Sequence, residues 1–413
     1  MKIKLFSFLL VISSCITAQN FKGVAYLPSY RMAHVDDINY GLITHVMASF
    51  VNPDSKGNMS IPSDIDNFVT KVHSHNAKAI ISIGGGGDYS WGNKVIIYEN
   101  LLKTAQTRTD FIKKIMTYVR DHKVDGLDND IEGNALALST FNIFSQELGD
   151  SIHAAGLEYS AAIGVGGSWG LNYWKKETLE KLDLIMTMSY GGVGSWNWST
   201  KDDGHAYEKM KSDMKYLTET SKIPKEKVLG GVPFYTVEFP NEAQPNYNSY
   251  TKTFCEIYND PQFDKHDLLH KDTLTTKDGN TLYINSLETL KKKMDYCNEF
   301  GGGVMIWEAG QDCFDGSISL MDSMFAYAQE KSLGLNEIPD LNVSVSQNPS
   351  EGKLTIKSDL NDPLKYEIYS SRGETVLQGE TKIINVSKLI TGVYFIKVSY
   401  SEIKYKSLKF TIK

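Results

Sequence analysis

The chain has 413 residues and carries 43 Lys and Arg against 50 Asp and Glu, which gives a net charge of −7 at pH 7. A hydrophobic fraction of 41% and a charged fraction of 23% are ordinary for a globular protein and exclude wholesale disorder. The length fits one large domain with a small one as well as it fits three domains of equal size. Nucleic acid is not an expected partner, because a nucleic-acid-binding domain normally has a basic surplus.

The start of the chain has the pattern of a signal peptide. Two lysines precede an apolar stretch, Leu5 to Ile12, that is too short to span a bilayer. We favour cleavage after Ala18 by an ordinary signal peptidase, which removes residues 1–18. The alternative is a lipoprotein signal that leaves Cys15 as a lipidated N-terminus. Either signal predicts an exported protein, secreted or held at the cell surface.

Short apolar or β-branched runs alternate with helical patterns between residues 21 and 333. Eight of these runs are predicted strands: Lys22–Leu27, Thr44–Phe50, Ala77–Ile83, Val124–Asp130, Glu158–Ile163, Leu184–Ser189, Val228–Pro233 and Gly303–Trp307. Helices are expected between them, as at Asp110–His122 and Ser139–Ala155. Eight strand–helix units predict a closed (β/α)8 TIM barrel, with an insertion at about residues 240–282. The alternative is a doubly wound sheet, which usually has an early GxGxxG motif that this chain lacks.

The pattern changes after residue 333. Residues 334–340 have the composition of a linker, and residues 341–413 contain short alternating runs separated by turns. These runs predict a small C-terminal antiparallel β-sandwich. Its strands are expected at Leu354–Ile356, Tyr366–Tyr369, Gly392–Val398 and Leu408–Ile412.

Three cysteines remain beyond the signal: Cys255, Cys297 and Cys313. An odd number allows one disulfide and one free thiol but no full disulfide framework. Their spacing fits no zinc-binding pattern, so no metal is expected from them.

The fourth predicted strand leads into the run Asp125-Gly-Leu-Asp-Asn-Asp-Ile-Glu132. Side chains alternate between the two faces of a strand, so Asp128, Asp130 and Glu132 are expected to point together into the barrel at its C-terminal rim. Catalytic groups of barrel enzymes lie at this rim, and mutual repulsion keeps one carboxyl protonated as a general acid. A solvated acidic loop or a metal site is the alternative. A metal is disfavoured because no His accompanies the cluster.

This run resembles the DGxDxDxE signature of glycoside hydrolase family 18, the chitinase family. Other segments similar to family motifs occur in the expected order: Val24–Pro28, His45–Phe50, Ser82–Gly85, Met188–Tyr190, Gly231–Tyr235 and Gly302–Trp307. The resemblance covers about residues 21–333. It implies a hydrolase without a cofactor that cleaves β-1,4 bonds next to N-acetylglucosamine.

The resemblance also implies a role for each matching residue. Glu132 is expected to be the general acid that protonates the glycosidic oxygen, and Asp130 to orient the 2-acetamido group of the substrate. Asp128 is expected to lie deeper and to share a proton with Asp130. Tyr190 is expected to hydrogen-bond the acetamido carbonyl or the ring, and Trp307 to form the apolar floor under the sugar. The implied nucleophile is the acetamido oxygen and not an enzyme carboxylate.

Substrate binding is also assigned to residues of matching motifs and of two glycine-rich loops: Ser82, Trp91, Met188, Trp196 and Tyr235. A further tryptophan, Trp198, follows Trp196 in the same loop. Each of these tryptophans either stacks on a sugar or packs against the barrel, and the sequence leaves both possibilities open.

The tail resembles a second family. The segment Ser346–Leu354, Ser-Gln-Asn-Pro-Ser-Glu-Gly-Lys-Leu, is similar to the YPNPxxGxL opening of type IX secretion sorting domains, and the likeness continues through Gly392–Tyr394. It implies that the type IX secretion machinery is a partner. A carbohydrate-binding module is the alternative, but such a module usually exposes a row of aromatics, and this tail has no Trp.

Three functions therefore compete. The leading one is a secreted hydrolase of chitin or chitooligosaccharides. The second is an endo-β-N-acetylglucosaminidase that acts on N-glycan cores with the same residues. The third is a chitinase-like lectin that binds without cutting. Glu132 disfavours the lectin, whereas Gly191 favours it, because the family motif has Asp at that position.

Overall fold

The computed structural model describes residues 21–412 except for 61, 63, 167–169, 202–203, 251, 316–317, 333–343, 349–351, 359–363, 371–374 and 402–403. The predicted signal peptide, the lipoprotein alternative at Cys15 and the predicted linker lie outside the described residues. The chain divides into two compact units, Met1–Asp322 and Ser323–Lys413, and each is described by itself.

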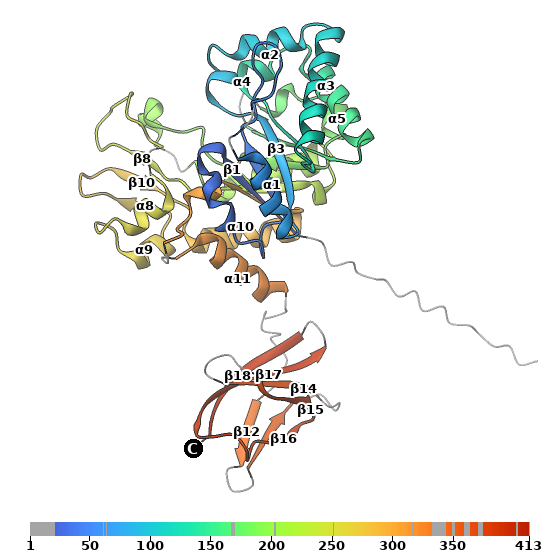
Figure 1. The fold of residues 1–413 in the computed structure, drawn as a ribbon. Coiled ribbons are helices and arrows are strands. Elements are labelled where there is room, and N and C mark those ends of the chain that lie inside the picture. Colours follow the sequence, from blue (N-terminus) through green and yellow to red (C-terminus); the bar gives the residue numbers. More distant parts are fainter. Residues whose placement is uncertain are drawn as a thin grey trace, which may run out of the picture. The chain divides into compact units, whose positions relative to one another are not determined.

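The first unit contains a closed barrel of eight parallel strands, which confirms the predicted (β/α)8 fold (Figure 1). Neighbouring strands follow the order β1-β11-β7-β6-β5-β4-β3-β2. The strands are β1 Lys22–Pro28, β2 His45–Ser49, β3 Lys78–Gly84, β4 Gly126–Asp130, β5 Glu158–Ile163, β6 Leu184–Thr187, β7 Val228–Pro233 and β11 Gly303–Trp307. The predictions for β5, β7 and β11 agree in full. The others differ by one or two residues at an end, because the apolar side-chain pattern does not stop where the hydrogen-bonded ladder stops.

Helices connect the strands and lie outside the barrel (Figure 1). They are α1 Ile65–Ser74, α2 Val95–Leu102, α3 Ala105–Asp121, α4 Gly133–Leu136, α5 Phe141–Ala154, α6 Lys176–Leu179, α7 Tyr207–Lys215 and α10 Leu287–Phe300, while α11 Leu320–Ser332 crosses the division between the units. One π-helix, η5 Tyr216–Thr220, and several 3-10 helices complete this unit: η1 Ser29–Asp36, η2 Gly87–Tyr89, η3 Leu171–Tyr173, η4 Ser195–Thr200, η6 Lys225–Lys227 and η7 Ala309–Gln311.

Helix α3 begins before the predicted start at Asp110. Its first turn is polar and therefore lacks the apolar periodicity on which the prediction depended. The turn is held instead by a cap, in which the Thr104 side chain accepts a hydrogen bond from the Thr107 backbone N–H. Capping thus sets the helix start, and side-chain periodicity marks only the part that packs on the barrel.

Inward-facing side chains fill the barrel. They form one cluster of buried residues: Val24, Tyr26, Met47, Ile80, Ala162, Leu184, Met186, Leu229 and Met305. Met188, Tyr190 and Trp307 pack on this cluster and are partly buried. They lie at or beyond the C-terminal ends of their strands, so the core ends at this rim and a site begins there.

The chain between β7 and α10 folds as a lobe beside the barrel (Figure 1). Its elements are a three-stranded antiparallel sheet with the order β8-β10-β9 and two short helices: β8 Val237–Phe239, α8 Phe254–Asn259, α9 Lys265–His270, β9 Thr273–Thr275 and β10 Thr281–Tyr283. A disulfide joins Cys255 in α8 to Cys313, which follows β11. Cys297 is a buried free thiol, so the cysteines form the one pair and one thiol that an odd number allows.

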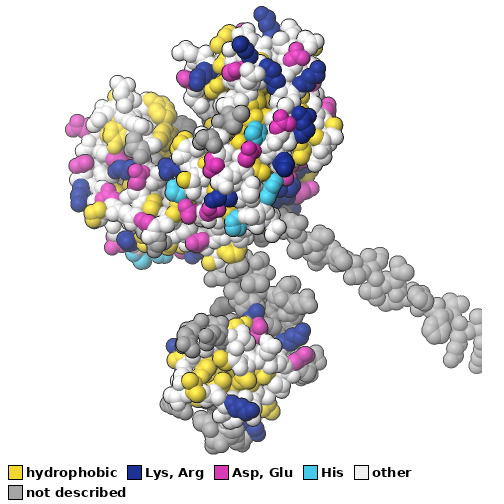
Figure 2. Space-filling model, viewed as in Figure 1, with side chains coloured by type: hydrophobic (Ala, Val, Ile, Leu, Met, Phe, Trp, Pro, Cys, Tyr) yellow, Lys and Arg dark blue, Asp and Glu magenta, His cyan; other side chains and the backbone are white. Residues whose placement is uncertain are grey.

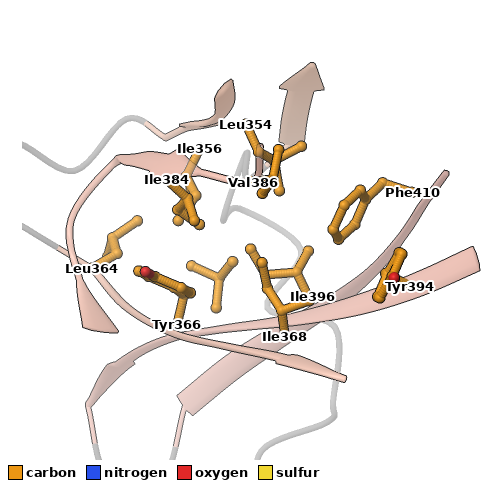
Figure 3. Close-up of a cluster of buried hydrophobic side chains, with 11 residues drawn as sticks. Leu354, Ile356, Leu364, Tyr366, Ile368, Ile384, Val386, Tyr394, Ile396 and Phe410 are labelled. Carbon is orange, nitrogen blue, oxygen red and sulfur yellow. The ribbon is translucent and has the colours of Figure 1, made fainter. Parts of the chain in front are cut away.

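The second unit is a small antiparallel β-sandwich, as predicted. Its sheets have the orders β12-β13-β16 and β15-β14-β17-β18. The strands are β12 Ser344–Asn348, β13 Lys353–Lys357, β14 Lys365–Ser370, β15 Thr375–Glu380, β16 Ile383–Asn385, β17 Gly392–Ser401 and β18 Lys404–Ile412. Figure 3 shows the core between the sheets, where Leu354 and Ile384 face Ile368 and Ile396. Strands β12, β15 and β16 were not predicted from the sequence. β15 is exposed along almost its whole length and shows little alternation, and β16 has only three residues.

Acidic and basic side chains are interspersed over the face of the first unit that Figure 2 shows. This face therefore presents no continuous patch of one sign. None of the helices in the described ranges combines the length and the hydropathy that a bilayer span requires.

Candidate active site

Asp128 lies at the bottom of the candidate site and is fully buried. Hydroxyl groups from β1 and from the two strands beside β4, β3 and β5, donate to its carboxylate. Tyr26 Oη and Ser82 Oγ bind Oδ2 at 2.7 and 2.6 Å, and Ser160 Oγ binds Oδ1 at 2.9 Å. Burial raises the pKa of Asp128, and these hydrogen bonds oppose the rise. The proton that Asp128 is expected to share with Asp130 stays a prediction.

Asp130 is the last residue of β4 and is 3% exposed. Burial, the charge of Glu132 and the charge of Asp128 raise the pKa of Asp130 well above its usual value. Its Oδ1 atom has no hydrogen-bond partner among the described residues. A buried polar atom without a partner is costly, so Oδ1 is well placed to bind a polar group of a ligand.

Glu132 follows β4 and is the N-cap residue of α4. Its backbone N–H donates to Ser90 Oγ at 3.2 Å. Burial raises the pKa of Glu132 to about 7. A carboxyl group with this pKa keeps its proton in mildly acidic solution, which is the state that a general acid needs.

A pocket of about 590 Å³ lies over Asp130 and Glu132, at the C-terminal ends of the barrel strands. Aromatic and glycine residues make up most of its lining: Tyr26, Phe50, Gly86, Gly87, Trp91, Asp130, Glu132, Ala162, Met188, Tyr190, Gly191, Gly192, Trp196, Tyr235, Tyr250 and Trp307. The charged residues in this lining are the two carboxylates. An apolar surface with a few convergent polar groups is typical of a site for a small molecule or a segment of a polymer.

The structure brings eight of the predicted site residues to this pocket: Trp91, Asp130, Glu132, Met188, Tyr190, Trp196, Tyr235 and Trp307. The other two, Asp128 and Ser82, lie beneath it and are hydrogen-bonded to each other. Trp91 and Trp196 are 49% and 59% exposed, so both rings remain accessible at the pocket. Trp198 does not line the pocket. Its indole N–H donates to the Pro240 carbonyl at 2.7 Å, and its ring packs against the inserted lobe.

Three aromatic residues of the pocket were not predicted as site residues: Tyr26, Phe50 and Tyr250. Tyr26 lies on β1 and also donates to Asp128. Phe50 directly follows β2, and its ring lies 5.9 Å from that of Trp307, with the two planes at 28°. Tyr250 comes from the inserted lobe and lies 5.6 Å from the Tyr235 ring. The position of Phe50 at the end of a predicted strand was a usable signal. No spacing in the insertion pointed to Tyr250.

One wall of the pocket consists of two segments joined by hydrogen bonds. The Ser195 backbone N–H, in the loop after β6, donates to Ser249 Oγ of the inserted lobe at 3.0 Å. A second hydrogen bond runs from the inserted lobe to the segment after β6, in which the Tyr250 hydroxyl donates to the Val193 carbonyl. This joined wall carries Trp196 and Tyr250, whose ring centroids are 6.0 Å apart.

Gly191 lines the pocket with a φ of 68°, in the left-handed region that favours glycine. A Cβ atom at this position would lie 3.2 Å from the Tyr235 hydroxyl. An Asp at residue 191 would therefore need both a strained backbone and a displaced Tyr235. The pocket lacks a carboxylate here, and the Tyr235 hydroxyl crowds the position that its Cβ would take.

The barrel fold and the in-phase carboxylates beneath an aromatic pocket define a glycoside hydrolase of the barrel type. The chain belongs to the glycosyl hydrolases family 18, whose family model matches residues 22–312. Residues 347–413 match the secretion system C-terminal sorting domain, which indicates export through type IX secretion.

Three known proteins illustrate the similarity. An endochitinase of Manduca sexta is 26% identical over 253 residues, which are 54% of this chain and 45% of that protein. The chain thus spans about half the length of this relative. The GH18 chitinase ChiB from the chitin utilization locus of Flavobacterium johnsoniae is 27% identical, with a TM-score of 0.67, over 76% of this chain and 96% of that chain. Human YKL-39, described as a pseudo-chitinase with retained chitooligosaccharide binding, is 18% identical, with a TM-score of 0.58, over 75% and 99% of the two chains. This last similarity is one of fold alone.

Proposed function

We propose that the protein is a secreted hydrolase that cleaves β-1,4 bonds at N-acetylglucosamine units of chitin or chitooligosaccharides. The observation that carries the proposal is the pairing of Glu132, with its raised pKa, and Asp130, with its unpartnered Oδ1, on the floor of an aromatic pocket. Residues 21–333 would form the catalytic domain. Residues 341–413 would direct export by the type IX machinery after a Sec signal peptide, and residues 334–340 would link the two.

In the proposed first step, the acetamido carbonyl oxygen of the substrate attacks the anomeric carbon. The glycosidic C–O bond breaks, and the leaving oxygen takes the proton of Glu132. Asp130 orients the acetamido N–H and stabilises the positive charge of the cyclic oxazolinium that forms. A water molecule then attacks the anomeric carbon and gives a proton back to Glu132. The acetamido group is restored, and the anomeric configuration is retained.

The placement of the carboxylates supports a nucleophile from the substrate. A retaining enzyme with its own nucleophile needs a second carboxylate on the opposite side of the sugar, about 5–5.5 Å from the acid. Asp130 and Glu132 are next-but-one residues at the end of β4, and both line the same pocket. Asp130 is therefore poorly placed to attack from the face opposite Glu132.

The lectin alternative has one observation in its favour. Gly191 leaves the pocket without the carboxylate of the family motif, and a pseudo-chitinase with this fold binds chitooligosaccharides. The presence of Glu132 with a raised pKa favours catalysis over binding alone. The N-glycan alternative uses the same carboxylates, so only the substrate distinguishes it.

The deciding experiment offers the purified protein a series of chitooligosaccharides and a high-mannose glycopeptide, and identifies the products by mass spectrometry. Shortened chitooligosaccharides would support the proposal, and glycopeptide cleavage alone would assign the second function. Binding without products, in the wild type as in Glu132→Gln, would assign the lectin.

Partly acetylated chitosan oligomers test the nucleophile. We expect N-acetylglucosamine at every new reducing end, because a free amine at the cleavage point lacks the attacking oxygen. Abundant glucosamine at those ends would contradict substrate assistance.

A further inference from the structure

The loop after β3 is fastened to the segment that carries Glu132. Ser90, in this loop, is fully buried, and its hydroxyl donates to the Gly85 carbonyl at 2.5 Å. The same hydroxyl accepts the backbone N–H of Glu132 at 3.2 Å. The Ser90 carbonyl accepts the N–H of Asn134 at 2.8 Å. One serine thus closes the loop on itself and joins it to both sides of the Glu132–Gly133 turn.

The same loop covers the turn. Gly133 has a φ of 58°, and a Cβ on it would lie 2.6 Å from the Trp91 ring. Trp91 therefore packs directly on the backbone after Glu132, where only glycine leaves room for it. Gly86, in the same loop, lies near the carboxyl, since a Cβ there would be 3.7 Å from Glu132 Oε1. The loop therefore packs on the backbone after Glu132 and borders its carboxyl, which on its other side lines the pocket.

We propose that Ser90 is a positioning residue, which holds the loop of residues 85–91 over the Glu132–Gly133 turn and so limits the access of water to the Glu132 carboxyl from that side. The inference rests on the proposed function in one respect, namely that Glu132 is the general acid. Ser90 itself touches no reacting atom and acts only through Glu132.

The proposal has a consequence for pH dependence. The ionisable groups that interact with Glu132 are Asp130 on β4 and Tyr190 after β6, and both remain when the loop loosens. What changes is hydration. Burial is what holds the pKa of Glu132 at about 7, so water entry lowers this pKa toward the usual 4.5. The acid must be protonated to act, so turnover is then lost at a lower pH.

The first test compares kcat for chitooligosaccharide hydrolysis as a function of pH. Ser90→Ala removes both hydroxyl hydrogen bonds. We expect the alkaline limb of the profile to shift to lower pH by about one unit. Ser145→Ala is the matched control. Ser145 is equally buried and bonds to Tyr159 and Asn129 behind β4, so its loss leaves the limb in place. If kcat of Ser90→Ala instead falls by the same factor at every pH and the alkaline limb does not move, the proposal is overturned.

A second measurement does not need activity. The Glu132 carboxyl is titrated by ¹³C NMR in the full chain, and Glu132→Gln identifies its signal. A lower pKa in Ser90→Ala supports the proposal even if no sugar is cleaved, in which case only the proposed function fails. An unchanged pKa overturns it. If Ser90→Ala does not fold, Trp91→Ala decides by the same titration, because it removes the cover and keeps the Ser90 hydrogen bonds. A lower pKa of Glu132 in Trp91→Ala supports the proposal that this loop limits the access of water to the carboxyl, and an unchanged pKa overturns that proposal.

Discussion

Glu132→Gln removes the proposed proton donor and preserves the size of the side chain. With a pKa of about 7, about 90% of the Glu132 carboxyls are protonated at pH 6, whereas the usual pKa of 4.5 would leave about 3% protonated. Burial therefore multiplies the active fraction by about 30-fold at that pH. Loss of the acid itself typically costs about 10²–10⁴-fold in rate. We expect Glu132→Gln to lose at least this factor and to retain sugar binding.

The assay follows release of short chitooligosaccharides by chromatography over a range of pH, and calorimetry measures binding. Wild-type activity should fall as pH rises through about 7, because Glu132 then loses its proton. Glu308→Gln is the control. Glu308 is a buried carboxyl at the same rim, its pKa is raised to about 6, and it pairs with Arg31 at 3.0 Å outside the pocket lining. This variant should keep the alkaline limb. A Glu132→Gln enzyme with more than about a tenth of the wild-type rate would refute the assignment of the acid.

Three further changes test other parts of the molecule. Asp130→Asn should lower kcat more than it raises KM, because its role develops late in the reaction; steady-state kinetics with an unchanged kcat would contradict this. Gly191→Asp should lower the melting temperature, since a left-handed backbone costs a side chain about 1–2 kcal/mol, and should not raise kcat. Gly191→Ala is its control, and higher activity in the Asp variant alone would show that the missing carboxylate limits turnover. Removing the Cys255–Cys313 disulfide, which closes a loop of 58 residues, should cost about 4 kcal/mol in denaturant unfolding, whereas Cys297→Ala leaves that loop closed.

The inner layer of the site followed from the sequence because strand periodicity is local. The prediction that Asp128, Asp130 and Glu132 lie together required only the alternation of side chains along β4 and the residues that follow it. The partners of Asp128 did not follow in the same way. Tyr26 is 102 residues away, and only barrel closure brings its hydroxyl to the carboxylate.

The walls of the pocket were less predictable because they depend on loops. Trp196 and Trp198 share one glycine-rich segment, yet Trp196 lines the pocket, whereas Trp198 donates a hydrogen bond to the Pro240 carbonyl. Which of the two tryptophans lines the pocket depends on the fold of the inserted lobe, and the sequence of this lobe has no simple hydrophobic periodicity. Tyr250 and Ser90 escaped notice for the same reason, since their partners are set by loop geometry.

The joined wall has a consequence for engineering new specificity. Trp196 and Tyr250 belong to different loops, but the Ser195–Ser249 and Tyr250–Val193 hydrogen bonds cross between them. If only one of the two loops is replaced by that of a relative, these donors and acceptors lose their hydrogen-bond partners in the other loop. Chimeras should therefore exchange the segment after β6 and the inserted lobe together, as a single cassette, if the transplanted aromatic rings are to keep their spacing.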